Sequence, residues 1–184
     1  MQTQIERLVG ELRTASDEAR ALVEGSSESV LTARPGPGRW SAAECLAHLV
    51  VTSEAYVPLM AGALKAHAPS PGKARFRMDT AGWLIKRSLE PPVRIRTRTV
   101  EEFLPRAFGS PREILTRFLE LQEGPERVLQ SAEGFDLNAI LVVSPFNRRI
   151  RYNLYSCFRI ILAHQRRHLW QARRAASGAL RSTA

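Results

Sequence analysis

Two histidines stand four residues apart near the C-terminus, in the stretch "ILAHQRRHLWQ" of residues 161–171. Residues four apart lie on the same face of an α-helix, so His164 and His168 could act together. Three interpretations are open. The imidazoles could bind a metal ion, they could face nucleic acid together with the arginines between them, or they could pack in a basic helix.

The apolar residues that precede this pair predict which way its side chains point. Steps of three and four residues give one helical stripe, made of Leu154, Cys157, Phe158, Ile161, His164 and His168. The arginines of the same segment fall mostly on other faces; they are Arg159, Arg166, Arg167, Arg173 and Arg174. The two histidines therefore replace core residues, which weakens the interpretation as a nucleic-acid surface.

A catalytic site of the zinc type needs a third protein ligand and an open position for water or substrate. His48 is the candidate, because it lies near the inward face of a second predicted helix. That face carries Cys45, His48, Thr52, Tyr56 and Leu59. Facing helices of a bundle can hold a metal between them. A structural role, with each imidazole bonded to a carbonyl or a hydroxyl, is the alternative that these residues leave open.

Neighbouring residues limit the chemistry of such a site. Gln165 stands where the metalloprotease motif His-Glu-x-x-His has its glutamate, so the general base of that class is missing. Cys45 could be a fourth ligand, but it also suits a hydrophobic contact with Trp40 at the start of its helix. His67 lies in a loop rich in proline and glycine, where we expect it to be solvated.

Long amphipathic helices are predicted to position the histidines. Apolar residues at helical spacing predict the first helix over about 4–23. The second begins with a capping box, Ser41-Ala-Ala-Glu44, and runs to about residue 66 with a kink near Pro58. The third begins with another capping box at Ser110 and runs to about 132, with a bend at 124–125.

The fourth helix is predicted over about 152–176, after a loop that ends in "SPFNRRIR". Short extra helices are expected in the connections 25–40 and 67–109, where "TAGWLIKRSLE" predicts a helix and "PPVRIRTRTVEEF" an extended or irregular segment. Together these elements predict an all-α four-helix bundle. We expect a single domain, 1–184, with a basic tail from about residue 177.

The net charge of +9 raises the question of nucleic-acid binding. However, 24 of the 27 basic residues are arginines spread along the chain, which points to general composition rather than one binding face. The arginines of "RIRTR" (94–98) could bind an anionic substrate, although a solvated surface is the simpler explanation. No apolar run of ~18 residues predicts a membrane span, and no signal-peptide pattern begins the chain, so a cytoplasmic location is expected. Cys45 and Cys157 are expected to be buried thiols without a disulfide.

Two motifs resemble those of the DinB-like superfamily of metal-binding four-helix bundles. The first is "RPGPGRWSAAECLAHLV", which matches at Trp40, Ser41, Glu44 and His48. The second is "AHQRRHLWQA", which matches at His164, Arg167, His168 and Gln171. The resemblance covers roughly residues 5–175.

This resemblance implies that His48, His164 and His168 hold a divalent metal ion, often zinc or nickel, with solvent completing the coordination. Some relatives are transferases or isomerases that depend on low-molecular-weight thiols, and many have no known reaction. Members commonly form dimers through the bundle. Many relatives also carry His-Pro in the loop before the last helix, where this chain has Ser144-Pro145. Any role of that histidine is missing here.

We therefore expect a metal-dependent enzyme acting on a small molecule, with thiol-group transfer preferred over hydrolysis. The metal would lower the pKa of a bound water or thiol and polarise a substrate oxygen. No catalytic base is identified: Glu44 is more simply a helix cap, while Tyr152, Tyr155 and Gln171 are candidates to surround the ligands. The alternatives are a non-catalytic metal-binding or stress-related protein and a nucleic-acid-associated basic protein, the last being disfavoured.

Overall fold

The computed structural model describes residues 2–70, 75–92, 99–105 and 109–182. Within these residues the chain forms α-helices, one 3-10 helix (η1) and one pair of strands. The elements are α1 (Gln2–Glu24), α2 (Glu28–Thr32), α3 (Ala42–Lys65), α4 (Thr80–Leu89), η1 (Glu101–Phe103), α5 (Pro111–Gln130), β1 (Leu141–Ser144), β2 (Asn147–Asn153) and α6 (Leu154–Ser182). The predicted all-α fold is confirmed, and α2 and α4 are short helices in the two connections where such helices were expected. The 3-10 helix η1 lies at the end of "PPVRIRTRTVEEF", which was predicted to be extended or irregular.

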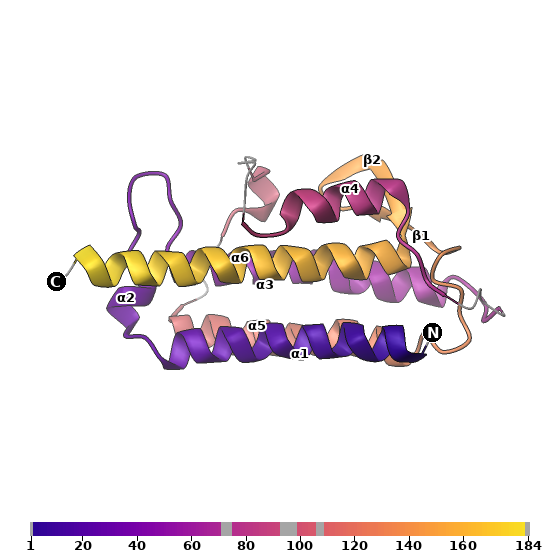
Figure 1. The fold of residues 1–184 in the computed structure, drawn as a ribbon, viewed down its shortest axis with the longest axis horizontal. Helices are drawn as coiled ribbons and strands as arrows, with labels where there is room; N and C mark the ends of the chain where they lie inside the picture. The colour runs from indigo at the N-terminus through magenta and orange to yellow at the C-terminus, as the bar shows by residue number, and fades with distance from the viewer. Residues whose placement is uncertain (1, 71–74, 93–98, 106–108, 183–184) are drawn as a thin grey trace.

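The four long helices form a bundle in which α1 packs on α5 and α6, and α3 packs on the same two partners. Helices α1 and α6 run in one direction and α3 and α5 in the other, so the chain ends lie at opposite ends of the bundle (Figure 1). Because α3 and α5 are parallel, the connection between them returns along the length of the bundle. Antiparallel α3 and α6 bring His48 level with the C-terminal histidines.

Both predicted capping boxes are present and fix where α3 and α5 begin. The Ser41 hydroxyl accepts a hydrogen bond from the Glu44 amide, and the Glu44 carboxylate accepts one from the Ser41 amide. Ser110 and Glu113 make the same reciprocal pair at α5. Each box satisfies amide groups that have no partner inside the helix. Neither helix ends at its internal proline, Pro58 or Pro125.

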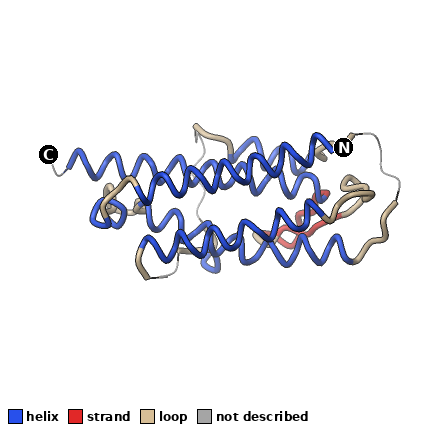
Figure 2. Tube along the Cα trace, turned by 90° about the horizontal axis from the view of Figure 1, so that it is seen from below, coloured by secondary structure: helices blue, strands red, loops and turns tan. Residues whose placement is uncertain are grey.

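The segment before α6 differs from the sequence prediction, because it forms an antiparallel hairpin rather than a loop. Strand β1 alternates exposed and buried residues, and its buried Val142 pairs with the buried Tyr152 of β2 (Figure 2). That two-residue period is the pattern of a half-buried strand. Helix α6 consequently begins at Leu154, and it reaches Ser182 because Ala176 and Ala179 are still buried in the core. The predicted end near residue 176 was too early.

Two apolar clusters occupy the bundle, with a layer of polar residues between them. One cluster contains Leu162 and the residues nearer the hairpin, and the other contains Leu169 and the residues nearer α2. The buried polar side chains between these two positions of α6 are Gln165, Arg167 and His168. Since buried polar groups are costly unless they are paired, this layer is where function is most expected.

Helix α3 is the most apolar of the long helices. It is the one helix, among the described residues, that is long and apolar enough by length and composition to cross a membrane. However, 61% of its most apolar window is buried inside the protein, as in the core helix of a bundle. Gly124 of α5 allows α3 to approach closely, because a Cβ there would lie 2.5 Å from a methyl group of Val57.

Candidate metal centre

Three histidines from two antiparallel helices meet in the polar layer. His48 comes from α3, and His164 and His168 come from successive turns of α6. Their ligand nitrogens all lie within 4.8 Å of one another, and the Nε2 atoms of His48 and His164 are 3.1 Å apart. The fourth histidine, His67, is exposed and bonds through Nδ1 to the Ala63 carbonyl at 2.8 Å.

The carbonyl of Phe103 sets the orientation of His48. It lies 2.6 Å from Nδ1 of that imidazole, and a carbonyl can only accept, so Nδ1 carries the proton. The lone pair of His48 is therefore on Nε2, the atom that faces His164. A backbone carbonyl on the far nitrogen of an imidazole is the usual way in which a metal-binding histidine is held.

Two polar atoms at the other end of the cluster have no partner. Nδ1 of His168 and Oε1 of Gln171 are both buried and make no hydrogen bond. The two residues are three apart on α6, so their side chains are neighbours on the helix surface. One is a potential donor and the other an acceptor. Gln171, one of the four residues expected around the ligands, therefore stands about one helical turn from His168, and its side-chain oxygen is buried.

Aromatic rings enclose the imidazoles on two sides. The ring centre of Trp40 is 5.0 Å from that of His48 and 5.9 Å from that of His168. Phe146, in the turn of the hairpin, lies 6.1 Å from His164 on the same measure. His48 and His168 are buried, whereas His164 is partly exposed. Solvent or a substrate would therefore reach the cluster from the His164 side.

Burial keeps the three imidazoles neutral. Desolvation lowers the pKa of His164 and of His168 well below the usual value, and neighbouring positive charge lowers both further. The pKa of His48 is also lowered by burial, although its hydrogen bond to Phe103 opposes the shift. The guanidinium of Arg167, which donates to the Ser88 carbonyl, contributes to each shift. Neutral imidazole is the form that binds metals.

These observations fit one divalent ion. Two nitrogens that each lie ~2.0–2.1 Å from a tetrahedral zinc ion are about 3.3 Å apart, close to the observed Nε2 separation. Without an ion, one of the two nitrogens must carry a proton for the pair to be attractive. The group of donor atoms comprises the three histidines, within the part of the chain that the structure describes. Cys45 is outside it, in the apolar core, where burial raises the pKa of its thiol to about 12.

The remaining candidates from the sequence have other contacts. Glu44 caps α3 and forms an ion pair with Arg34. Tyr152 is hydrogen-bonded to Tyr56 at 3.0 Å in the core near the hairpin. Tyr155 accepts a hydrogen bond from Gln4 of α1. The structure does not bring these three expected residues, Glu44, Tyr152 and Tyr155, to the cluster.

Gln165, at the position of the missing protease glutamate, is also turned away from the histidines. It donates to Oε1 of Gln122 at 2.7 Å and accepts a longer hydrogen bond in return, which ties α6 to α5. Cys45 and Cys157 are both buried and free, as expected. The arginines of "RIRTR" (94–98) lie outside the described residues.

Sequence reasoning missed several parts of the site. A backbone carbonyl leaves no mark in the sequence, so nothing pointed to Phe103. Trp40 was expected only as a helix-start contact, and its second role beside His48 and His168 follows from the fold. Phe146 occupies the turn after Ser144-Pro145, and the position of that turn near His164 could not be known without the hairpin.

A model of the DinB superfamily matches residues 11–172 of the sequence. The chain belongs to the DinB superfamily. Its three clustered histidines lie on the two DinB motifs, within the matched residues. Neither a search of curated proteins nor a search of solved structures gave a match.

Proposed function

We propose that this DinB-superfamily protein binds one divalent metal ion, zinc or nickel, through His48, His164 and His168. The observation that carries the proposal is the convergence of three neutral imidazole nitrogens within 4.8 Å in an otherwise well-packed core. Three neighbouring lone-pair donors are poorly satisfied by one another, and a cation satisfies all three.

We further propose that the site is catalytic and that thiol-group transfer is the preferred reaction. When bound, the ion would lower the pKa of a coordinated thiol or water and polarise a substrate oxygen. The chain's own residues keep the imidazoles neutral and hold the proton of His48 on Nδ1. Trp40 and Phe146 exclude water from two sides, and the partly exposed His164 leaves one side for the substrate.

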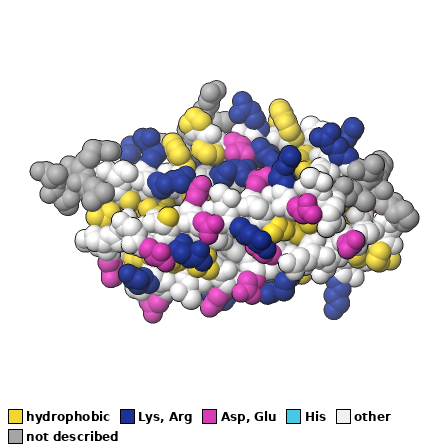
Figure 3. All heavy atoms as spheres, turned by 60° about the horizontal axis from the view of Figure 1, so that its bottom comes forward, with side chains coloured by type: hydrophobic (Ala, Val, Ile, Leu, Met, Phe, Trp, Pro, Cys, Tyr) yellow, Lys and Arg dark blue, Asp and Glu magenta, His cyan; other side chains and the backbone are white. Residues whose placement is uncertain are grey.

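A non-catalytic metal-binding role is the second candidate. The burial of His48 and His168 favours it, because a closed site holds a metal without giving substrates access. Nucleic-acid binding has weaker support. On the face that carries α1 and α5, basic and acidic side chains alternate (Figure 3). Arg13, Arg117 and Arg127 form ion pairs with glutamates.

The first experiment measures metal content by elemental analysis. Wild type, His164→Ala and His67→Ala are loaded with zinc or nickel and freed of excess ion. We expect about one ion per chain in wild type and in His67→Ala, and a large loss in His164→Ala. Equal content in all three proteins would exclude the histidine cluster as the site.

The second experiment separates the two roles of a confirmed site. Metal-loaded protein is assayed with several small thiols and electrophilic co-substrates, with His164→Ala as the blank. Metal-dependent consumption of the thiol supports transfer, whereas a loaded but inactive protein supports the non-catalytic role. Dimer formation and a cytoplasmic location remain predictions, and sedimentation analysis tests the first.

A further inference from the structure

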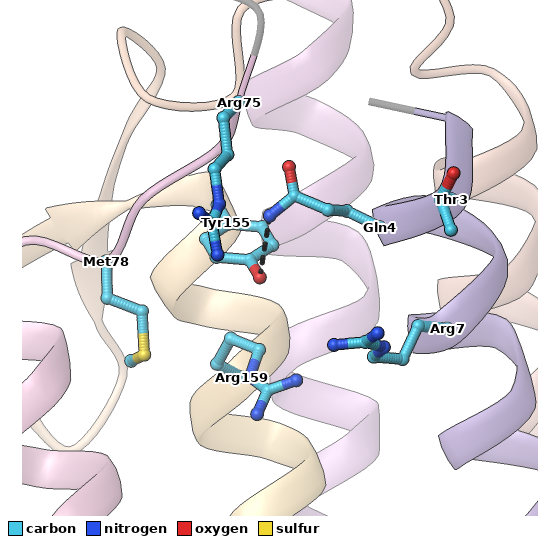
Figure 4. A pocket seen from close by; sticks show the side chains of 7 residues that line it. All are labelled: Thr3, Gln4, Arg7, Arg75, Met78, Tyr155 and Arg159. Carbon is cyan, nitrogen blue, oxygen red and sulfur yellow. Dashed lines mark hydrogen bonds between the residues drawn. The ribbon is translucent and has the colours of Figure 1, made fainter.

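A second candidate site lies at the end of the bundle where α1 and α6 begin. It is a cavity of about 320 Å³, lined by Thr3, Gln4, Arg7, Arg75, Met78, Tyr155 and Arg159 (Figure 4). This volume is near the lower end for small-molecule sites, ~300–1,000 Å³. None of the three clustered histidines lines it, and nothing in the proposed metal chemistry uses its residues.

The lining of this cavity is strongly positive. Three arginines come from three different segments, α1, the chain before α4 and α6, and no acidic residue is among the lining residues. Arg159 is paired with Glu11 at 2.8 Å, and Glu11 also pairs with Arg166, which pairs with Glu90 as well. Arg159 is therefore the neutralised arginine of the three. The side chains of Arg7 and Arg75 form no ion pair or hydrogen bond with any residue that the structure describes.

The hydrogen bonds of Gln4 leave the Tyr155 hydroxyl free to donate. Gln4 is fixed by two hydrogen bonds with the backbone of Phe76, one accepted at 2.9 Å and one donated at 3.1 Å. Its amide also donates to the Tyr155 hydroxyl oxygen at 3.4 Å. Since Tyr155 accepts there, its own O–H proton is left to point elsewhere. The ring of Phe76, 5.6 Å from that of Tyr155, holds this phenol in place.

The N-terminus of α1 adds to the same field, because Thr3 and Gln4 lie in its first turn. Tyr155 lies in the first turn of α6, but the amides there are already paired: Leu154 and Tyr155 donate to backbone carbonyls, and Ser156 donates to the Asn153 side chain. The unpaired amides of a first helical turn carry partial positive charge and favour anions. Guanidinium groups, the Tyr155 hydroxyl and the start of α1 thus surround one cavity, and together they favour an anionic oxygen ligand.

We infer that this cavity binds the phosphate group of a small molecule. Guanidinium groups that approach from three segments suit a tetrahedral dianion better than a planar monoanionic carboxylate, whose two oxygens one arginine fork can satisfy. The cavity volume corresponds to roughly ten water molecules at ~30 Å³ each, so a small organic group can accompany the phosphate. Met78 provides an apolar wall for that group.

Titration calorimetry with inorganic phosphate and phenyl phosphate tests this inference. The proteins are wild type, Arg7→Gln, Arg75→Gln and the control Arg148→Gln, which removes a charge that is also exposed but lies on β2, outside the cavity. We expect one site per chain. The affinity should fall about tenfold in each cavity variant, as for the loss of one charged hydrogen bond, and less than twofold in the control.

Phosphate can also coordinate a metal, so the titration is repeated with EDTA and with His164→Ala. Unchanged binding in both assigns the phosphate to the cavity, and loss of binding in both would overturn the inference in favour of the histidines. Equal weakening in Arg148→Gln and Arg7→Gln would mean that net charge attracts the anion, and would also overturn it. Acetate that binds as tightly as phosphate would also overturn the inference. So would an oligonucleotide that displaces phosphate and whose own binding Arg148→Gln weakens as much as Arg7→Gln does.

Discussion

Thermal stability in the presence and absence of metal gives the most direct check on the histidine cluster. A ligand that binds only the folded protein stabilises it by RT ln(1 + [L]/Kd), which is about 2.7 kcal/mol at one hundred times Kd. For a chain of this size, 1 kcal/mol changes Tm by roughly 2–4 °C. Wild type should therefore melt about 8 °C higher with zinc or nickel at that concentration than with EDTA.

Replacing His164 by alanine should remove most of this difference. His164 is the partly exposed member of the cluster, so this variant is the one most expected to fold. Loss of an orienting partner alone weakens metal binding ~10–100-fold, and loss of a ligand costs at least as much. At one hundredfold weaker binding, the same metal concentration only equals Kd. The stabilisation is then about 0.4 kcal/mol, or roughly 1 °C.

The quantity to compare is the metal-dependent change in Tm within each protein, measured by scanning calorimetry. This choice cancels any effect of the substitution on the metal-free fold. His67→Ala is the matched control, because that histidine is exposed and its imidazole bonds to the Ala63 carbonyl rather than to the cluster. If His164→Ala keeps the full wild-type shift, or if His67→Ala loses it, the assignment of ligands is refuted.

Three further substitutions test other parts of the structure. Glu44→Ala should lower the free energy of unfolding by about 1 kcal/mol in urea, because the capping box is lost, and it should leave the metal content unchanged. A loss of metal would instead place Glu44 at the site. Burial alone would raise the pKa of Glu90, but hydrogen bonds from Arg166 and Lys86 outweigh the effect of burial and lower this pKa to about 2. This carboxylate therefore stabilises the fold fully at pH values above its ordinary pKa of ~4.5, and this stabilisation is lost as the pH falls towards 2. Glu90→Gln should cost about 1 kcal/mol in urea at pH 7, after allowance for solvent screening, and progressively less in acid; an equal cost at both pH values would contradict the ion pair. Gly82→Ala should lower Tm, since a Cβ there would lie 2.3 Å from Cβ of Ser156, and overpacking typically costs ~1–3 kcal/mol; an unchanged Tm would mean that α4 is not held against α6.

The predictable parts of this fold are those whose causes are local in sequence. Helix starts follow from capping boxes, in which residues three apart satisfy each other's amides, and both boxes were found where they were expected. Helix faces follow from the 3.6-residue period, which correctly turned His48, His164 and His168 inward. The hairpin was missed because β1 has only four residues, too few for its alternation to stand out from a loop.

The surroundings of the histidines depend on long-range packing, which no local pattern records. The Phe103 carbonyl reaches His48 from 55 residues away, and any residue at 103 would supply the same atom. Tyr152 was assigned to the helix, although it belongs to β2 and pairs with Tyr56. That error followed directly from the missed hairpin. Ligand types were therefore readable from sequence, but their partners required the tertiary structure.

The placement of Tyr155 is different, because helical geometry alone separates it from the metal ligands. At about 100° per residue, Tyr155 and Arg166 fall within roughly 40° of Arg159 around the axis of α6, whereas His164 and His168 fall about 140–180° away. The contacts agree: Arg159 and Arg166 both bind Glu11 of α1. On the opposite side of the helix, His164 faces His48 of α3.

One helix thus presents two chemically distinct faces to two different neighbours. The face towards α3 carries neutral nitrogen donors suited to a cation, and the face towards α1 carries guanidinium groups and a phenol suited to an anion. Because the ligands have opposite charge and share no side chain, substitutions on one face should leave binding at the other intact. If a phosphate ligand changed the affinity for the metal, the coupling would have to pass through α6 itself. Gln165 stands between His164 and Arg166 on this helix, and its hydrogen bond to Gln122 ties α6 to α5.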